Sequence, residues 1–307
     1  ENDIEQSIAQ VYIQILYAAE SVKVNENTLQ VSEAQRDRGK QLLDAGSIAR
    51  SDYAQLEAQV STDRYQLVTA QATLQDYKLQ LKQLLELDGE QEMQVYLPAL
   101  GDENVLSPLP TKTDVFRSAV ALRPEIEASK LSVEASELGI GIAKSGYLPS
   151  VSLTAGIGTN HTSGSDFTFG EQVKNGWNNS IGLSISVPIF NNRQTKSAVE
   201  KAKLQYQTSQ LTLLDEQKTL YKTIEGLWLD ANSAQQRYAA AIEKLHSTQT
   251  SYELVSEQFN AGMKNTVELL TEKNNLLQAQ QELLQSKYMA ILNTQLLKFY
   301  QGDKITL

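Results

Sequence analysis

The chain repeats apolar residues at heptad spacing over long stretches, and an Ala-Gly pair interrupts the pattern twice, at Gly46 and at Gly262. Heptad spacing is typical of helices that pack as coiled coils, and glycine is the usual residue just beyond a helix end. Residues 1–87 and 191–300 are therefore each predicted to form a long antiparallel helical hairpin with its tip near one of these glycines. The apolar positions of the first hairpin are Ile4, Ile8, Val11, Ile15, Ala18, Val22 and Leu29, then Tyr53, Leu56, Val60, Leu67, Ala70, Leu74, Tyr77, Leu81 and Leu84.

One charged residue, Asp63, falls among the apolar positions that follow Gly46. We interpret these positions first of all as coiled-coil packing. Asp63 then either faces a water-filled lumen or is a defect near the surface of the helix pair, and the sequence leaves both interpretations open.

The two predicted hairpins are related by an internal repeat. A shift of 216 residues places Gly46 on Gly262 and superposes the heptad positions before them. The same shift places Asp52 on Glu268, so a carboxylate follows each glycine at the same distance. Heptad periodicity alone does not explain this second match, so we infer a duplication. The first repeat lacks a counterpart of residues 114–216, which we expect in a segment preceding this chain; the alternative is a cytosolic protein that begins here without a signal peptide.

Between the hairpins the helical pattern stops and resumes. Residues 88–113 contain three prolines and no helical period, which indicates a linker. Asp114 is then a candidate N-cap for a helix over residues 114–146, with a kink or a break at Arg123-Pro124. Residues 301–307 form a C-terminal tail.

Residues 147–190 change to a period of two, in which apolar residues alternate with small or polar ones. This pattern predicts two strands, each with one apolar face, joined by a polar loop. The apolar faces are formed by Val151, Leu153, Ile157, Ile181, Leu183 and Ile185. The loop carries Phe167, Phe169 and Trp177, which are either membrane-interface aromatics or loop aromatics packed on one another.

Composition excludes several classes of function. The chain has 27 Lys plus Arg against 37 Asp plus Glu, a net charge of −10, whereas nucleic-acid binding requires a basic surface. It has no cysteine for disulfides or thiolate metal sites. Its two histidines, His161 and His246, are far apart, and no phosphate-binding glycine loop, nucleophile elbow or zinc motif occurs. We expect no enzyme activity, no cofactor, no metal site and no nucleic-acid partner.

The order of these elements resembles the TolC-like outer-membrane efflux protein family. Local motifs carry the resemblance: LRPEI at 122–126, YLPS at 147–150, VPIFNN at 187–192, and AG at 261–262 followed by TVELL at 266–270. The resemblance implies a mainly α fold with a small β part. Long antiparallel helical hairpins would build a periplasmic α-barrel, and the amphipathic strands would join a transmembrane β-barrel shared by a trimer. Residues 88–113 and 301–307 would belong to its equatorial region.

The same resemblance implies a function and partners. The chain would be a subunit of a homotrimeric channel in the bacterial outer membrane, with its strands in lipid and its helices in the periplasm. The channel would act as a passive export duct in a tripartite efflux or type I secretion system. A periplasmic adaptor (membrane fusion) protein and an inner-membrane transporter would be its partners. The alternative is a periplasmic adaptor or coiled-coil scaffold, although adaptors usually add a compact β-rich domain that this sequence does not encode.

The resemblance finally implies a periplasmic gate at the hairpin tips. Glu268 matches the aperture carboxylate, Lys264 the basic link and Phe259 the gate aromatic. Ser51 and Asp52 would be their partners in the first hairpin. The alternative for the two carboxylates is a solvated position at a helix start, where the helix dipole favours negative charge.

Overall fold

The computed structural model describes residues 2–87, 93–98, 100–101 and 105–305. They form two compact units. The hairpin unit comprises Glu1–Leu122 and Leu220–Leu307, and the strand unit comprises Arg123–Thr219. The predicted linker lies partly outside the described residues, and its described part has neither helix nor strand before Lys112. Among the helices of the described ranges, none is both long enough and apolar enough to cross a membrane.

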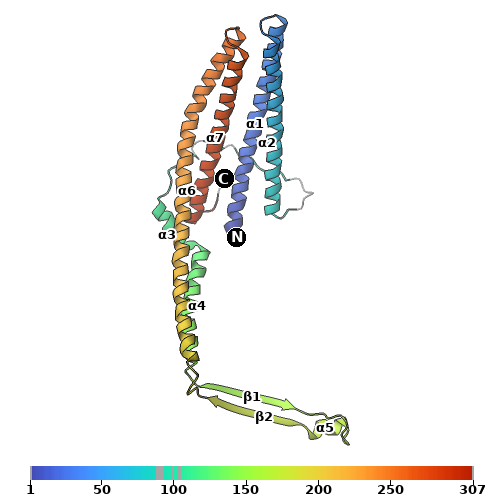
Figure 1. Cartoon of the computed structure of the whole chain (residues 1–307), viewed down its shortest axis with the longest axis vertical. Helices are drawn as coiled ribbons and strands as arrows, with labels where there is room; N and C mark the ends of the chain where they lie inside the picture. The colour runs from blue at the N-terminus through green and yellow to red at the C-terminus, as the bar shows by residue number, and fades with distance from the viewer. Residues whose placement is uncertain (1, 88–92, 99, 102–104, 306–307) are drawn as a thin grey trace. The chain divides into compact units, whose positions relative to one another are not determined.

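The hairpin unit contains the two predicted helical hairpins. Helix α1, Asn2–Asp44, packs antiparallel along α2, Arg50–Leu84. Helix α6, Gln194–Asn260, starts in the strand unit, and its later part forms the second hairpin with α7, Thr266–Gln301 (Figure 1). Helix α1 also packs against α7, as does the short helix α3, Lys112–Leu122.

Helix α1 is buried on two sides, which a single heptad seam does not predict. Ile15 and Ala18 of the predicted seam are buried, but so are Ile13 and Leu16. Because successive residues of a helix are separated by about 100° around its axis, these four positions cover a wide face. The reason is that α1 packs against both α2 and α7.

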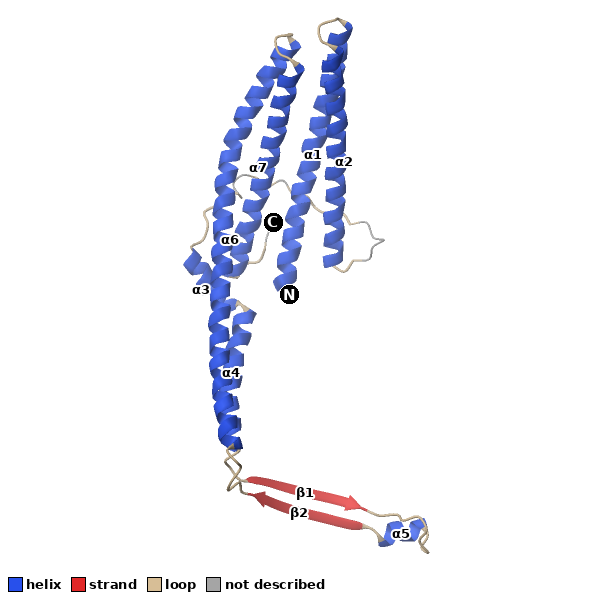
Figure 2. Ribbon diagram, viewed as in Figure 1, coloured by secondary structure: helices blue, strands red, loops and turns tan. Residues whose placement is uncertain are grey.

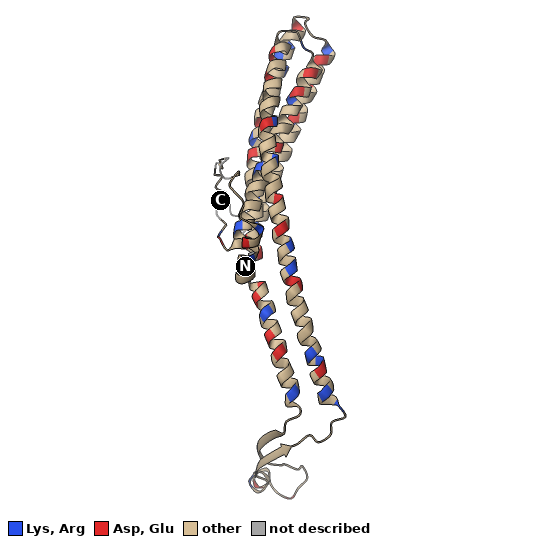
Figure 3. Ribbon diagram, turned by 90° about the vertical axis from the view of Figure 1, so that its left-hand side faces the viewer, with Lys and Arg blue, Asp and Glu red and all other residues tan. Residues whose placement is uncertain are grey.

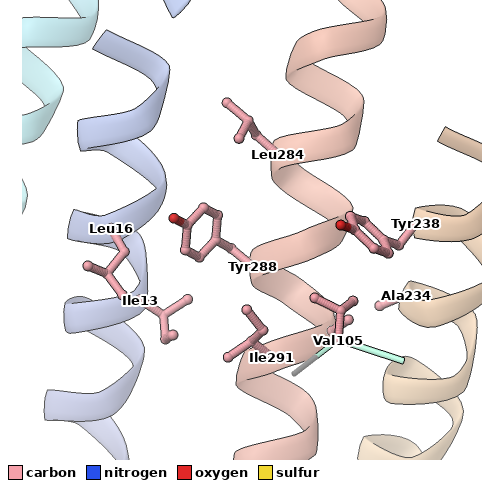
Figure 4. Close-up of a cluster of buried hydrophobic side chains, with 9 residues drawn as sticks. Ile13, Leu16, Val105, Ala234, Tyr238, Leu284, Tyr288 and Ile291 are labelled. Atoms are coloured by element: carbon pink, nitrogen blue, oxygen red, sulfur yellow. The ribbon is translucent and has the colours of Figure 1, made fainter. Parts of the chain in front are cut away.

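The main core lies where the first hairpin meets the second (Figure 4). Ile13 and Leu16 of α1 lie opposite Tyr288 and Ile291 of α7, while Tyr238 of α6 packs on the other side of α7. Burying one side chain of this size stabilises the fold by roughly 1.5–3 kcal/mol. The α1 residues of this core, Ile13 and Leu16, thus join the two repeats from positions outside the predicted heptad seam.

The strand unit begins with a helix break. Helix α3 ends at Leu122 and α4, Pro124–Ser145, starts with the proline at its first turn, so of the predicted kink or break at Arg123-Pro124 the structure confirms the break. The prediction that Asp114 is an N-cap is wrong, because α3 begins at Lys112. The hydroxyl of Thr111 accepts the Asp114 N–H at 3.3 Å and donates to the Asp114 carboxylate at 2.6 Å. Asp114 is therefore the third residue of the helix, where a capping-box acid belongs.

The two predicted strands form one antiparallel sheet. Strand β1, Ser150–Gly158, pairs with β2, Asn178–Ser186. The intervening loop also contains a short helix, α5, Phe169–Asn175, that sequence analysis missed. Its signal was present: the Thr168 N–H donates to the Glu171 carboxylate at 3.0 Å, which is the Thr-x-x-Glu capping box.

Candidate functional site

The two hairpin tips share one backbone geometry. Gly46 and Gly262 adopt left-handed angles, with φ of +71° and +73°, a region that costs other L-residues roughly 1–2 kcal/mol. Their N–H groups donate to the carbonyls of Leu43 and Phe259, both at 2.9 Å. The next N–H in each tip donates to the carbonyl five residues before it, at 2.8 and 2.9 Å. These paired bonds form the Schellman motif, so the repeated Ala-Gly has a local structural cause.

The helix after each tip begins with the same kind of acid. Asp52 and Glu268 occupy the third positions of α2 and α7. Their carboxylates accept the backbone N–H of Ala49 at 3.3 Å and of Asn265 at 3.2 Å. The Asn265 side chain also accepts the Glu268 N–H at 2.9 Å, whereas Ala49 has no side-chain oxygen. Both acids therefore help their helices to begin.

Lys264 and Glu268 form an ion pair within the second tip. The Nζ–Oε1 distance is 2.5 Å, and the two side chains are 37% and 41% exposed. The hydrogen bond from Lys264, with one from a backbone N–H, lowers the pKa of Glu268 below its ordinary value. Ile48 stands in the place of Lys264 in the first hairpin. Among the contacts of the described residues, Lys264 is paired with Glu268 and Asp52 with Ala49, so the structure does not bring Lys264 and Asp52 together.

Phe259 connects the two tips. It is 3% exposed and packs with Leu56 of α2 and Leu269 of α7. Ser51 is exposed beside Asp52 in the first turn of α2. The predicted gate residues thus lie at neighbouring tips, with Phe259 buried between the hairpins.

Asp63 is neither solvent-facing nor a surface defect within this chain. It is 1% exposed and forms an ion pair with Lys273 of α7, which is 3% exposed. The Ser32 hydroxyl of α1 donates to Asp63 and accepts from Lys273, and Gln59 donates to the other carboxylate oxygen at 2.9 Å. Burial lowers the pKa of Lys273, and the hydrogen bond and charge of Asp63 oppose that shift. The sequence does not reveal Lys273 as the partner of Asp63, because the two residues are 210 positions apart along the chain.

The strand hairpin places its large apolar residues on one face, which also carries Asn179 opposite Ile157, and small or polar residues on the other face. Val151 lies opposite Ile185, and Leu153 lies opposite Leu183. The six predicted apolar residues are 63–84% exposed, so nothing in the described part of the chain covers them. The other face carries Ser150, Ser152, Thr154, Gly156, Ser180, Gly182, Ser184 and Ser186.

The strands are also free of charge. Neither β1 nor β2 contains Asp, Glu, Lys or Arg, whereas charged residues recur along the helices (Figure 3). Figure 2 shows the two strands as a hairpin with α5 at its loop end. An exposed hairpin with one charge-free apolar face is suited to a non-aqueous environment on that side.

The loop aromatics do not pack on one another. Phe167, Phe169 and Trp177 are 58–66% exposed. Phe169 meets the ring of His161 edge to face at 5.2 Å, and the His161 Nδ1 lies 3.0 Å from the Gln172 side-chain oxygen. Among the ring pairs of the described residues, none joins two of these three aromatics. Their position at a membrane interface stays a prediction.

Comparison with known proteins supports the resemblance in sequence. The chain is 24% identical over 294 residues to the outer membrane efflux protein BepC of Brucella suis biovar 1, covering 95% of this chain and 61% of BepC. It is 26% identical over 298 residues to the outer membrane protein TolC of Escherichia coli, covering 93% of this chain and 58% of TolC. The chain therefore spans about three fifths of the length of these relatives.

Comparison with solved structures supports the fold. The crystal structure of CusC, from a study of its folding and transmembrane channel formation, superposes with a TM-score of 0.82 at 19% identity, covering 98% of this chain and 68% of that one. This likeness confirms the predicted fold class, mainly α with a small β part. The profile of the family described as outer membrane efflux protein matches residues 115–302, more than half of the chain. The chain therefore belongs to the outer membrane efflux protein family and is an outer-membrane protein.

Proposed function

We propose that the complete protein is a subunit of an outer-membrane export channel, a passive duct in a tripartite efflux or type I secretion system. Family membership supports this proposal, and the strand hairpin supplies its structural basis. Strands β1 and β2 have nine residues each, which suits the ~9–11 residues of a transmembrane strand. Their apolar face would contact lipid, and their serine, threonine and glycine face would line a polar lumen.

The hairpin requires further strands to be stable. A two-stranded hairpin is at best marginally stable alone, and its outer edges leave backbone groups unpaired. In lipid those groups must be satisfied, which a closed barrel achieves. Other copies of the protein would supply further strands, so we propose a homotrimer.

The helices of the strand unit also present uncovered apolar stripes. Leu131, Leu138 and Ile142 of α4 are 55–74% exposed, and Leu204 and Leu211 of α6 are 62% and 67% exposed. Leucines seven residues apart lie on one stripe of a helix. Exposed apolar stripes of this kind mark protein interfaces. We assign them to helix contacts within the trimer, which would close an α-barrel in the periplasm.

The hairpin tips would form the periplasmic entrance of this duct. Glu268 would place one carboxylate per subunit at the aperture, with Lys264 as its neighbouring cation. A periplasmic adaptor and an inner-membrane transporter would deliver substrate to this entrance. The adaptor alternative is disfavoured, because the chain belongs to the outer membrane efflux protein family.

Two neighbouring residues of β2 test the proposal. Leu183 is on the apolar face and Ser184 on the polar face of the same strand. Leu183→Arg in the full-length protein should reduce trimer recovery from outer membranes, because arginine at the lipid midplane costs ~2–4 kcal/mol. Ser184→Arg should assemble normally and change the single-channel conductance in planar bilayers. Equal tolerance of both variants, or no conductance from the purified wild-type protein, would count against an outer-membrane channel.

A further inference from the structure

The buried ion pair joins three helices from both repeats. Asp63 lies on α2, Ser32 on α1 and Lys273 on α7, and each residue is at most 3% exposed. The three side chains contact one another, and Gln59 completes the hydrogen bonding of the carboxylate. The cluster therefore lies in the interface between the first hairpin and the second.

Other ion pairs of the hairpin unit differ in their surroundings. Lys244 and Glu282 link α6 to α7 at 2.7 Å, but their side chains are 43% and 41% exposed. A half-exposed pair is solvated whether or not it forms, so its loss changes little. A buried pair is different, because separating the partners leaves both charges without water or counter-charge.

Heptad packing alone does not define one alignment of the two hairpins. An apolar pattern that repeats every seven residues allows a neighbouring hairpin to shift by one heptad, about 10 Å along the axis, and still bury apolar side chains. A shift of this size would carry Lys273 about 10 Å away from Asp63 and break the ion pair. Buried polar residues are known to select one register in coiled coils for this reason.

We propose that Ser32, Asp63 and Lys273 form a register clasp, which fixes the axial alignment of the first hairpin on the second. The clasp lies near the tips: Lys273 is seven residues after the start of α7, roughly 10 Å along the helix. It therefore also fixes the height of Asp52 relative to Glu268. The importance of that height for a gate rests on the proposed function, whereas the alignment itself does not.

These 307 residues contain no cysteine, so cysteines introduced among them can report the alignment. Cysteines for spin labels are introduced at exposed Glu57 on α2 and exposed Asn275 on α7, in subunits diluted into unlabelled wild-type ones. Double electron–electron resonance then gives the distance distribution within one subunit. The wild-type clasp should give one narrow distance. The apolar replacement Asp63→Leu with Lys273→Met should give a second distance population, from hairpins shifted by about 10 Å along the axis.

Two controls separate the clasp from ordinary stability. Removing the exposed pair by Lys244→Met with Glu282→Leu should leave one narrow distance. If the apolar replacement does not assemble, the swapped pair Asp63→Lys with Lys273→Asp tests the proposal instead. A single narrow distance in the swapped variant supports the clasp. A distance distribution as broad as that of Lys273→Asp alone contradicts it. A single wild-type distance in the assembled apolar variant would overturn the proposal. These distances need no channel activity, so a failure of the export function would not alter them.

Discussion

Asn265 and Glu268 cap each other at the start of α7: each side chain accepts the backbone N–H of the other residue, at 2.9 and 3.2 Å. At the corresponding place in the first hairpin, the Asp52 carboxylate accepts the N–H of Ala49, but the alanine side chain has no oxygen to accept the N–H of Asp52. The two tips are therefore matched in backbone geometry but unequal in capping. This inequality allows one tip to be used as the control for the other.

Removing the cap from the second tip and adding one to the first should change the free energy of unfolding in opposite directions. Asn265→Ala should destabilise the protein by about 1 kcal/mol, because a backbone N–H of α7 loses its acceptor. Ala49→Asn should stabilise it by a similar amount, provided that the capping geometry of Asn265 is reproduced. Urea-induced unfolding of the two variants measures both changes. A destabilising Ala49→Asn would show that the first tip has no room for the cap.

Acid should weaken the second tip selectively. The pKa of Glu268 is below its ordinary value of 4.5 in the folded protein, so its stabilising effect is complete above pH 4.5 and is lost as the pH falls through the lowered value. Hydrogen exchange at residues 259–268, corrected for intrinsic rates, should increase below about pH 4.5. Glu268→Gln should remove this acid dependence, and an unchanged dependence in that variant would assign it to another group.

Gly39 should resist a substitution that normally strengthens helices. It lies inside α1, where a Cβ would collide with the Leu56 side chain of α2. A Cβ added to Gly226, inside α6, would meet only open space. Gly226→Ala should therefore stabilise the protein by up to about 1 kcal/mol, and Gly39→Ala should lower the thermal midpoint because the buried Leu56 side chain must shift. Equal midpoints for the two variants would contradict the close helix contact.

The gate proposal predicts separate effects at two positions. Glu268→Ala should weaken the cation preference of the channel, measured from the reversal potential in a salt gradient, because three carboxylates would leave the axis and three lysines would lose their partners. Asp52→Ala should leave the preference intact and raise the resting conductance. If Glu268→Ala kept the wild-type reversal potential, Glu268 would be a helix-capping residue alone.

The sequence predicted best what local chemistry determines. The reversals at Gly46 and Gly262 and the carboxylates after them belong to Schellman motifs and capping boxes, whose parts lie within about ten residues of one another. Such motifs are readable because the same short segment contains donor and acceptor. The capping box of Thr168 and Glu171 is equally local and marks the start of α5.

Contacts between distant segments were less predictable. The heptad pattern marked Ile15 as buried, but it did not reveal that α1 has two partners, although the additional apolar residues Ile13 and Leu16 were a signal for a wider face. Nothing in the sequence paired Asp63 with Lys273, since many alignments of two long helices satisfy the same periodicity. Their contact required the three-dimensional arrangement of both hairpins.

The residues of the register clasp differ between the two repeated hairpins, so the hairpins are not interchangeable. The repeat shift places Asp63 on Ala279 and Lys273 on Glu57, so each half carries one partner and lacks the other. A chain with two copies of the second hairpin would bury a lysine opposite alanine. A chain with two copies of the first hairpin would bring two acids together. Exchanging one hairpin for a copy of the other would therefore remove the buried ion pair.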